Sequence, residues 1–71
     1  MMIEINSVTP GSQVQHFGVM CVILSIKKRS HFLWSANMLR NGVIQRLIVE
    51  PTYLLDVTWS PNELHQNASL A

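Results

Sequence analysis

Apolar and polar residues alternate along most of the chain, with the period of two that is typical of β-strands. Four segments carry this alternation: 2–5, 12–17, 31–39 and 43–49. Between them, residues 19–26 are apolar at nearly every position, so we expect this segment to be the central strand, covered on both faces for part of its length. Residues 52–57 predict a short last strand. The pattern therefore indicates an all-β domain.

Turn residues separate these segments. Asn41-Gly42 stands between two apolar runs and predicts a two-residue type I′ hairpin, because both central residues of that turn need positive φ. Pro10-Gly11 predicts another turn, and Gly18 predicts a bulge or a tight corner. Glu50-Pro51 ends a strand, since proline has no N–H to donate. We expect about five antiparallel strands over residues 1–57, closed into a small barrel because closure removes exposed edges.

The C-terminal residues, 58–71, predict a tail with one short helix. Ser60, Pro61 and Glu63 have the spacing of an N-cap, a first helical residue and the acidic partner of a capping box. We expect the helix to run from Pro61 to Asn67. The alternative is a disordered tail, which is common at chain termini.

Several stretches together follow the outline of a known fold. They are "PGSQV", "GVMCVILSI", "FLW", "RNGVIQRLIV" and "PTYLLDV". Over residues 10–57 this pattern resembles SH3-like barrels, an outline that many small, uncharacterised bacteriophage proteins follow. The resemblance implies a five-stranded antiparallel barrel from a phage, either cytoplasmic in a bacterial host or associated with the virion. "WSANML" is longer than the link usual after the tryptophan, so the third strand of the barrel is expected to be extended or bulged.

Composition points to a protein that does not work alone. Apolar residues make up 48% of the chain and charged residues 13%, against about 25% charged in an average soluble domain. We expect an oligomer or a larger assembly, the alternative being a poorly soluble monomer. The longest apolar run, Val19 to Leu24, is far shorter than a membrane span of about 20 residues, and "MMIEIN" does not resemble a signal peptide. Cys21 lies within that run, so a buried and unreactive thiol is expected.

The residues that usually carry chemistry are scattered. Glu4, Glu50, Asp56 and Glu63 form no pair in sequence. His16, His31 and His65 lack metal-ligand spacing, and we interpret them as unrelated surface residues rather than a three-histidine site. The chain also has no glycine-rich phosphate loop. We therefore expect no enzyme activity, no cofactor, no metal and no small-molecule substrate.

The segments 31–39 and 43–49 carry apolar residues on both faces, which is more than a small barrel can enclose. Leu33, Leu39, Ile44 and Ile48 are therefore the candidate protein interface. The alternative is that the first strand and the C-terminal helix cover this face. The first hypothesis is a non-enzymatic protein-binding or assembly module that joins copies of itself or a larger complex. With the phage resemblance, it would be a minor virion component or a protein that binds a host factor.

Three of the five Lys and Arg residues of the chain are adjacent: Lys27, Lys28 and Arg29. The alternative function is therefore a small nucleic-acid-binding barrel that uses this basic turn, with Arg40 and Arg46 adding to one face. Because so few phosphates would be neutralised, binding would be weak and sensitive to salt. The simpler interpretation is a solvated turn whose charges protect the apolar run before it from aggregation.

Overall fold

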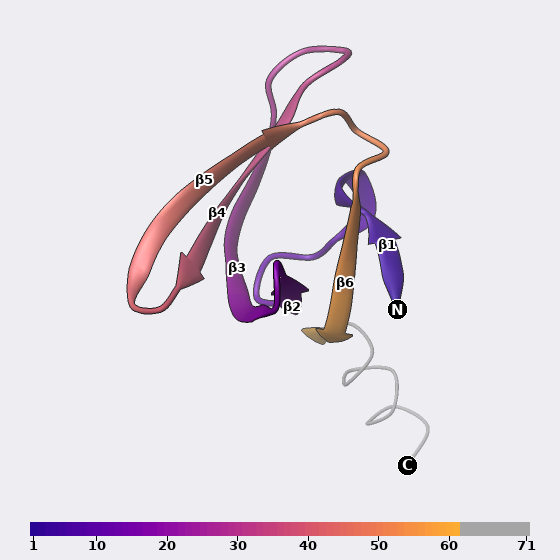
Figure 1. Cartoon of the computed structure of the whole chain (residues 1–71). Coiled ribbons are helices and arrows are strands. Elements are labelled where there is room, and N and C mark those ends of the chain that lie inside the picture. The colour runs from indigo at the N-terminus through magenta and orange to yellow at the C-terminus, as the bar shows by residue number, and fades with distance from the viewer. Residues whose placement is uncertain (62–71) are drawn as a thin grey trace.

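The computed structural model describes residues 1–61 of the chain. Within them the chain forms one antiparallel sheet of six strands, in the order β1-β6-β2-β3-β4-β5 (Figure 1). The strands are β1 (Met2–Glu4), β2 (Gln13–His16), β3 (Val19–Lys28), β4 (Trp34–Arg40), β5 (Val43–Val49) and β6 (Leu54–Trp59). A single 3-10 turn, η1 (Ile5–Ser7), follows β1. The all-β, antiparallel prediction is confirmed, with six strands instead of about five.

The expected closure of the sheet is wrong. β1 and β5 end the strand order, and they do not pair with each other. Figure 1 shows β5 and β1 at opposite sides of the molecule. β1 has three residues and pairs only with β6, so it is too short to complete a barrel against the seven residues of β5. The sheet therefore keeps two free edges.

Two tight turns set the register of the hairpins. Asn41 and Gly42 have φ values of 50° and 77° and join β4 to β5, as predicted for a type I′ turn. Phe17 and Gly18 have φ values of 50° and 75° and join β2 to β3 in the same way. The tight corner predicted at Gly18 is therefore confirmed.

The core lies on one face of the curled sheet. Its buried apolar residues come from every strand except β1 and β5, and from the connection after β1: Ile5, Val8, Val14, Cys21, Ile23, Ala36, Met38, Leu55 and Val57. Cys21 is fully buried, as expected. Met20 and Leu24, its neighbours on β3, are exposed. The prediction that β3 is covered on both faces is thus wrong, because no second layer packs on the outer side of β3 within the described residues.

A register shift interrupts β3. Its pairing with β4 skips Leu24, between Ile23 and Ser25. At this position the backbone of Ile23 also bonds to the turn before β2. Gly11 N donates to Ile23 O at 2.7 Å, and Ile23 N donates to Ser12 O at 2.9 Å. The extra residue keeps Ile26 on the core side. The third strand of the barrel, expected to be extended or bulged, is extended: β4 includes all of "WSANML" and pairs with β5 without a shift, and the bulge lies on β3.

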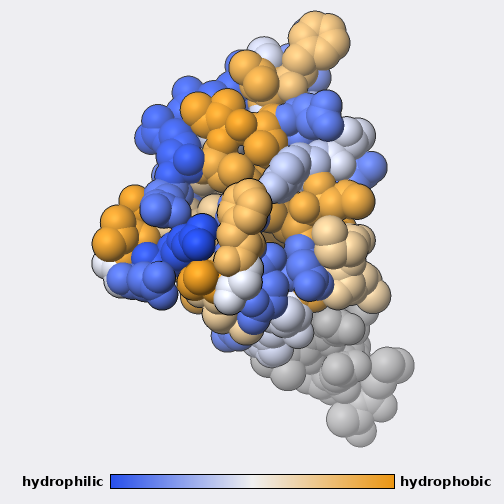
Figure 2. Space-filling view, viewed as in Figure 1, coloured by the Kyte–Doolittle hydropathy of each residue, from blue (hydrophilic) through white to orange (hydrophobic). Residues whose placement is uncertain are grey.

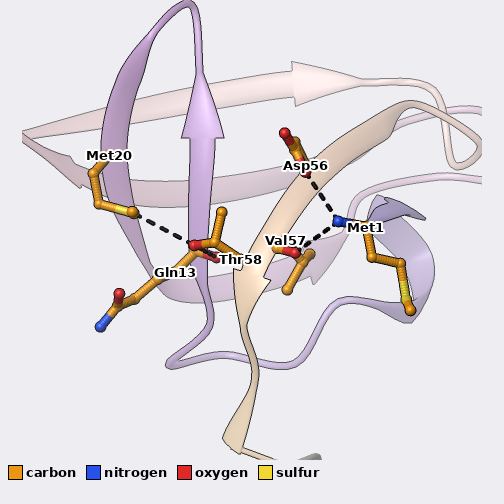
Figure 3. A network of polar contacts seen from close by, with 6 residues as sticks. All are labelled: Met1, Gln13, Met20, Asp56, Val57 and Thr58. Atoms are coloured by element: carbon orange, nitrogen blue, oxygen red, sulfur yellow. Dashed lines mark hydrogen bonds and ion pairs between the residues drawn. The ribbon is translucent and has the colours of Figure 1, made fainter.

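Polar contacts hold β6 between its neighbours (Figure 3). The Met1 amino group lies 3.1 Å from Asp56 Oδ1 and donates to the Val57 carbonyl at 3.0 Å. The Thr58 hydroxyl donates to the Gln13 carbonyl of β2 at 3.2 Å. The last strand predicted over 52–57 is present but shifted, because it begins at Leu54 after a turn and continues to Trp59, into the segment expected as tail. The helix expected from Pro61 to Asn67 lies outside the described residues, apart from Pro61.

Phe17 has a backbone conformation in its turn that is unfavourable for a phenylalanine. It is 81% exposed and holds a positive φ that bulky side chains disfavour. Because asparagine adopts this conformation readily, Phe17→Asn is expected to raise the free energy of unfolding by about 1 kcal/mol. Urea denaturation measures the change. Phe32→Asn is the control, since Phe32 is equally exposed in another loop; an equal gain there would contradict the explanation.

Candidate protein interface

The predicted interface residues gather on one side of the sheet, which we call the outer face: the side of β3, β4 and β5 opposite the core. Leu39 lies directly across from Ile44, and Ser35 lies across from Ile48. Leu39, Ile44 and Ile48 are 38%, 64% and 51% exposed. The expectation that these side chains point outward is therefore met.

The outer face is not uniformly apolar. Asn37 Nδ2 donates to Ser25 Oγ at 3.1 Å, and Arg46 Nε donates to Asn37 Oδ1 at 3.4 Å. These three residues form a polar row across β3, β4 and β5. Toward the Asn41-Gly42 turn lies the apolar row of Val22, Leu39 and Ile44. The polar row thus separates this apolar row from Ile48.

Leu33 precedes β4 by one residue and is 45% exposed. Its carbonyl accepts hydrogen bonds from Arg29 N at 2.9 Å and from Ser30 N at 3.1 Å. The Ser30 hydroxyl in turn accepts from the backbone N–H of Phe32 and Leu33. The loop is therefore braced by its own backbone, and it holds Leu33 at the Ile48 end of the outer face.

The space-filling view shows how apolar surface is distributed (Figure 2). Apolar atoms appear at the ends of both long hairpins and across the middle of the molecule, in patches divided by polar residues. The exposed large apolar residues include Phe32 at one hairpin end and Val43 and Ile44 at the other. Eight of the 13 exposed large apolar residues among those described lie on β3, β4, β5 or the loop between β3 and β4, and the other five include Phe17 and Met1.

The three clustered basic residues are exposed but do not share one face. Lys27 pairs with Ser35 on the outer face, and Lys28 pairs with Trp34 on the opposite side. Arg29 begins the loop after β3. The structure therefore places the three charges around the end of a hairpin.

The other two arginines do not extend this basic cluster. Arg40 pairs with Val43, and Arg46 pairs with Asn37. Residues directly across from each other share a face, so Arg46 lies on the face of Asn37. Asn37 and Arg40 are three positions apart on β4, so the side chains of Arg40 and Arg46 leave opposite faces of the sheet. The expectation that Arg40 and Arg46 add to one basic face is wrong.

His16 is a partly buried titratable side chain with a perturbed pKa. Burial lowers its pKa from the usual 6.5, and the positive charge of Arg40 lowers it further. Its Nε2 lies 3.2 Å from the Tyr53 hydroxyl, whereas its Nδ1 is buried without a hydrogen-bond partner. The Phe17 ring packs against it at 4.5 Å between centroids. This group is a polar contact within the fold, between β2 and the approach to β6.

Some of these features were accessible to sequence reasoning and were missed. The Asn41-Gly42 turn fixes the β4–β5 register, so the Asn37–Arg46 pair follows from residue numbers alone. Ser25 does not follow, because the register shift at Leu24 changes the pairing of β3. The contact of His16 with Tyr53 joins residues 37 positions apart and has no local signal.

No family model, curated protein or solved structure matches the chain. The residues that the structure describes include no helix long and apolar enough to cross a membrane. Residues 1–61 likewise contain no cluster of three metal-binding side chains.

His16 predicts a pH dependence of stability. Because folding lowers its pKa, the neutral ring is favoured in the native state, so its contribution is complete above about pH 6.5 and declines as pH falls through the lowered pKa. His16→Gln is expected to flatten the dependence of the free energy of unfolding on pH in this window. Urea titrations at several pH values measure it. His31→Gln, at an exposed loop residue, is the control and should keep the wild-type slope.

Proposed function

We propose that the chain is a non-enzymatic protein-binding or assembly module that acts through the outer face of the β4–β5 hairpin. The observation that carries this proposal is the exposure of Leu39, Ile44 and Ile48 on one side of two paired strands. Val22, Leu39 and Ile44 form a contiguous apolar row there, and contiguous exposed apolar surface often marks a protein-interaction site.

The energetics favour covering this face. Each large aliphatic side chain that goes from exposed to fully buried contributes roughly 1.5–3 kcal/mol. Three half-exposed side chains on a pre-formed hairpin therefore supply a useful part of a binding free energy. The polar row of Ser25, Asn37 and Arg46 lies within the same surface and offers directional contacts that would fix the orientation of a partner.

The strand order supports relating the fold to SH3-like barrels, as an open variant. In that resemblance 13–16 belongs to the opening segment and 54–59 to the closing one, and β2 and β6 pair with each other. The added strand β1 and the free edge of β5 depart from a closed barrel. As a small phage protein of this kind, the module would belong to a virion or to a complex with a host factor.

The second candidate function is weak nucleic-acid binding by Lys27, Lys28 and Arg29. It is favoured by the exposure of all three at the end of β3. The geometry limits it, because the side chains spread around the hairpin end and Arg40 and Arg46 leave opposite faces of the sheet. At most about three phosphates would be engaged by this cluster.

The interface proposal predicts a specific loss. Ile44→Ser combined with Ile48→Ser should reduce self-association of the full chain at least about tenfold, because two apolar side chains no longer leave water. Sedimentation velocity over a concentration series measures it. Leu54→Ser is the matched control, since Leu54 is also half exposed but lies on β6. If the double variant associates like wild type, self-assembly does not use this face.

The nucleic-acid candidate predicts a salt dependence. Binding to a duplex of random sequence should show a slope of log affinity against log salt of about −2.7, from about three phosphates at −0.9 each. Replacing Lys27, Lys28 and Arg29 with Ala should abolish that binding and leave self-association unchanged. Fluorescence anisotropy measures the binding. A steeper slope, or one unaffected by the triple replacement, would locate the contact elsewhere.

A further inference from the structure

β5 leaves an edge of the sheet without a partner. It stands last in the strand order and pairs only with β4 among the described residues. Its seven residues, VIQRLIV, carry a single charge, at Arg46. Long, weakly charged edges are templates for pairing with another strand, and proteins usually protect them. The other edge, β1, has only three residues.

The hairpin geometry identifies the backbone groups that face this edge. In a hairpin with a two-residue turn, the residues that flank the turn form a hydrogen-bonded pair, here Arg40 and Val43. Successive residues of a strand alternate in the direction of their N–H and C=O groups. Ile44, Arg46 and Ile48 therefore direct their backbone groups toward the free edge, and the same three residues carry outer-face side chains.

We propose that β5 pairs antiparallel with β5 of a second copy, about a two-fold axis at Ile48. This inference rests on the proposed function and names its partner. In this register Ile48 lies opposite Ile48 of the other copy, and Arg46 of each copy lies opposite Glu50 of the other. The two sheets become one continuous sheet, and the two outer faces join.

Charge favours this register over full overlap of the two β5 strands. Overlap of β5 along its full length would place Arg46 opposite Arg46, and like charges directly across a pair of strands are destabilising. Moving the axis to Ile48 replaces that contact with two Arg46–Glu50 pairs, which are favourable. β5 ends at Val49 and a turn at residues 51 and 52 follows Glu50, so the paired segment ends there.

Both charged groups are free to pair. Glu50 is exposed, and the one ion pair among the described residues joins Met1 and Asp56. The Glu50 carbonyl already accepts from Tyr53 N at 3.1 Å, so its side chain and its N–H group, and not its carbonyl, remain for the second copy. Arg46 uses its Nε on Asn37, which leaves the terminal guanidinium N–H groups for a carboxylate.

A two-fold contact also explains how the edge avoids open-ended growth. Pairing of β5 with β1 of the next copy would join different surfaces and continue into a fibre. β1 offers only three residues for such a contact. Pairing of β5 with itself uses residues 46–50 of both copies in one closed two-fold contact, so the assembly stops at two.

Charge reversal tests this register. Arg46→Glu and Glu50→Arg should each weaken self-association of the full chain about tenfold or more, because each places two like-charged pairs across the contact. An equimolar mixture of the two variants should form a heterodimer as tight as wild type. In that heterodimer the two replaced side chains face each other with opposite charge, and the native Glu50 of one copy faces the native Arg46 of the other. Sedimentation velocity measures the affinities, native mass spectrometry identifies the heterodimer, and circular dichroism verifies that each variant is folded.

Leu39→Ser separates edge pairing from stacking of outer faces, because Leu39 lies on β4 and not at the edge. Edge pairing predicts that this variant dimerises within about twofold of wild type. If Leu39→Ser dissociates the dimer while both charge variants retain it, the copies stack face to face, so the register is overturned and the proposed function stands. If the wild-type chain is a monomer at every concentration, edge pairing is overturned. If charge, Leu39 and Ile44/Ile48 variants all associate like wild type, both proposals fail.

Discussion

The structure depends on the burial of one side of a single sheet. Ile23 lies in the buried face, flanked by side chains from β2, β4 and β6, and its backbone also holds the turn at Gly11 and Ser12. With no second sheet or helix packed on the outer side of the β3–β4–β5 region within the described residues, only one of every two residues there reaches an apolar environment. A small domain buries a smaller share of its surface than a large one, and here the outer-face apolar residues Leu39, Ile44 and Ile48 remain exposed.

Two-residue turns determine which side chains lie on the exposed face of the sheet. The turns at Phe17-Gly18 and Asn41-Gly42 fix which residues lie opposite each other, and the face of each side chain follows from that register. Leu39 and Ile44 are neighbours for this reason, and so are Asn37 and Arg46. The bulge at Leu24 then sets how β3 joins the pattern and places Ser25 beside Asn37. Which side chains form the candidate interface therefore depends on the strand registers. A shift of one strand by one residue would move its outward side chains to the core face.

The outer face and the open edge belong to the same surface. Ile44, Arg46 and Ile48 carry outward side chains and are also the residues whose backbone groups face away from β4. A partner strand at this edge would satisfy backbone hydrogen bonds and enlarge the apolar outer face at the same time. The low charge content of the chain, 13%, suits a protein whose surface is partly covered in use.

The sequence by itself determined the strands and much of the register. Hydrophobic patterning located segments within a few residues of the strands, although about five strands were expected and six are present, and β5 matched from Val43 to Val49. The Asn41-Gly42 pair fixed the β4–β5 hairpin because only certain residues accept positive φ. The same alternation placed Ile44 and Ile48 on one face of their strand but left open which face points outward, and the tertiary structure decided that. Tertiary structure alone decided that the sheet stays open, that β3 is covered on one side only, and that His16 meets Tyr53. Those outcomes depend on contacts between segments distant in sequence and on the length of short strands such as β1. The local periodicity of the sequence carries no information about either.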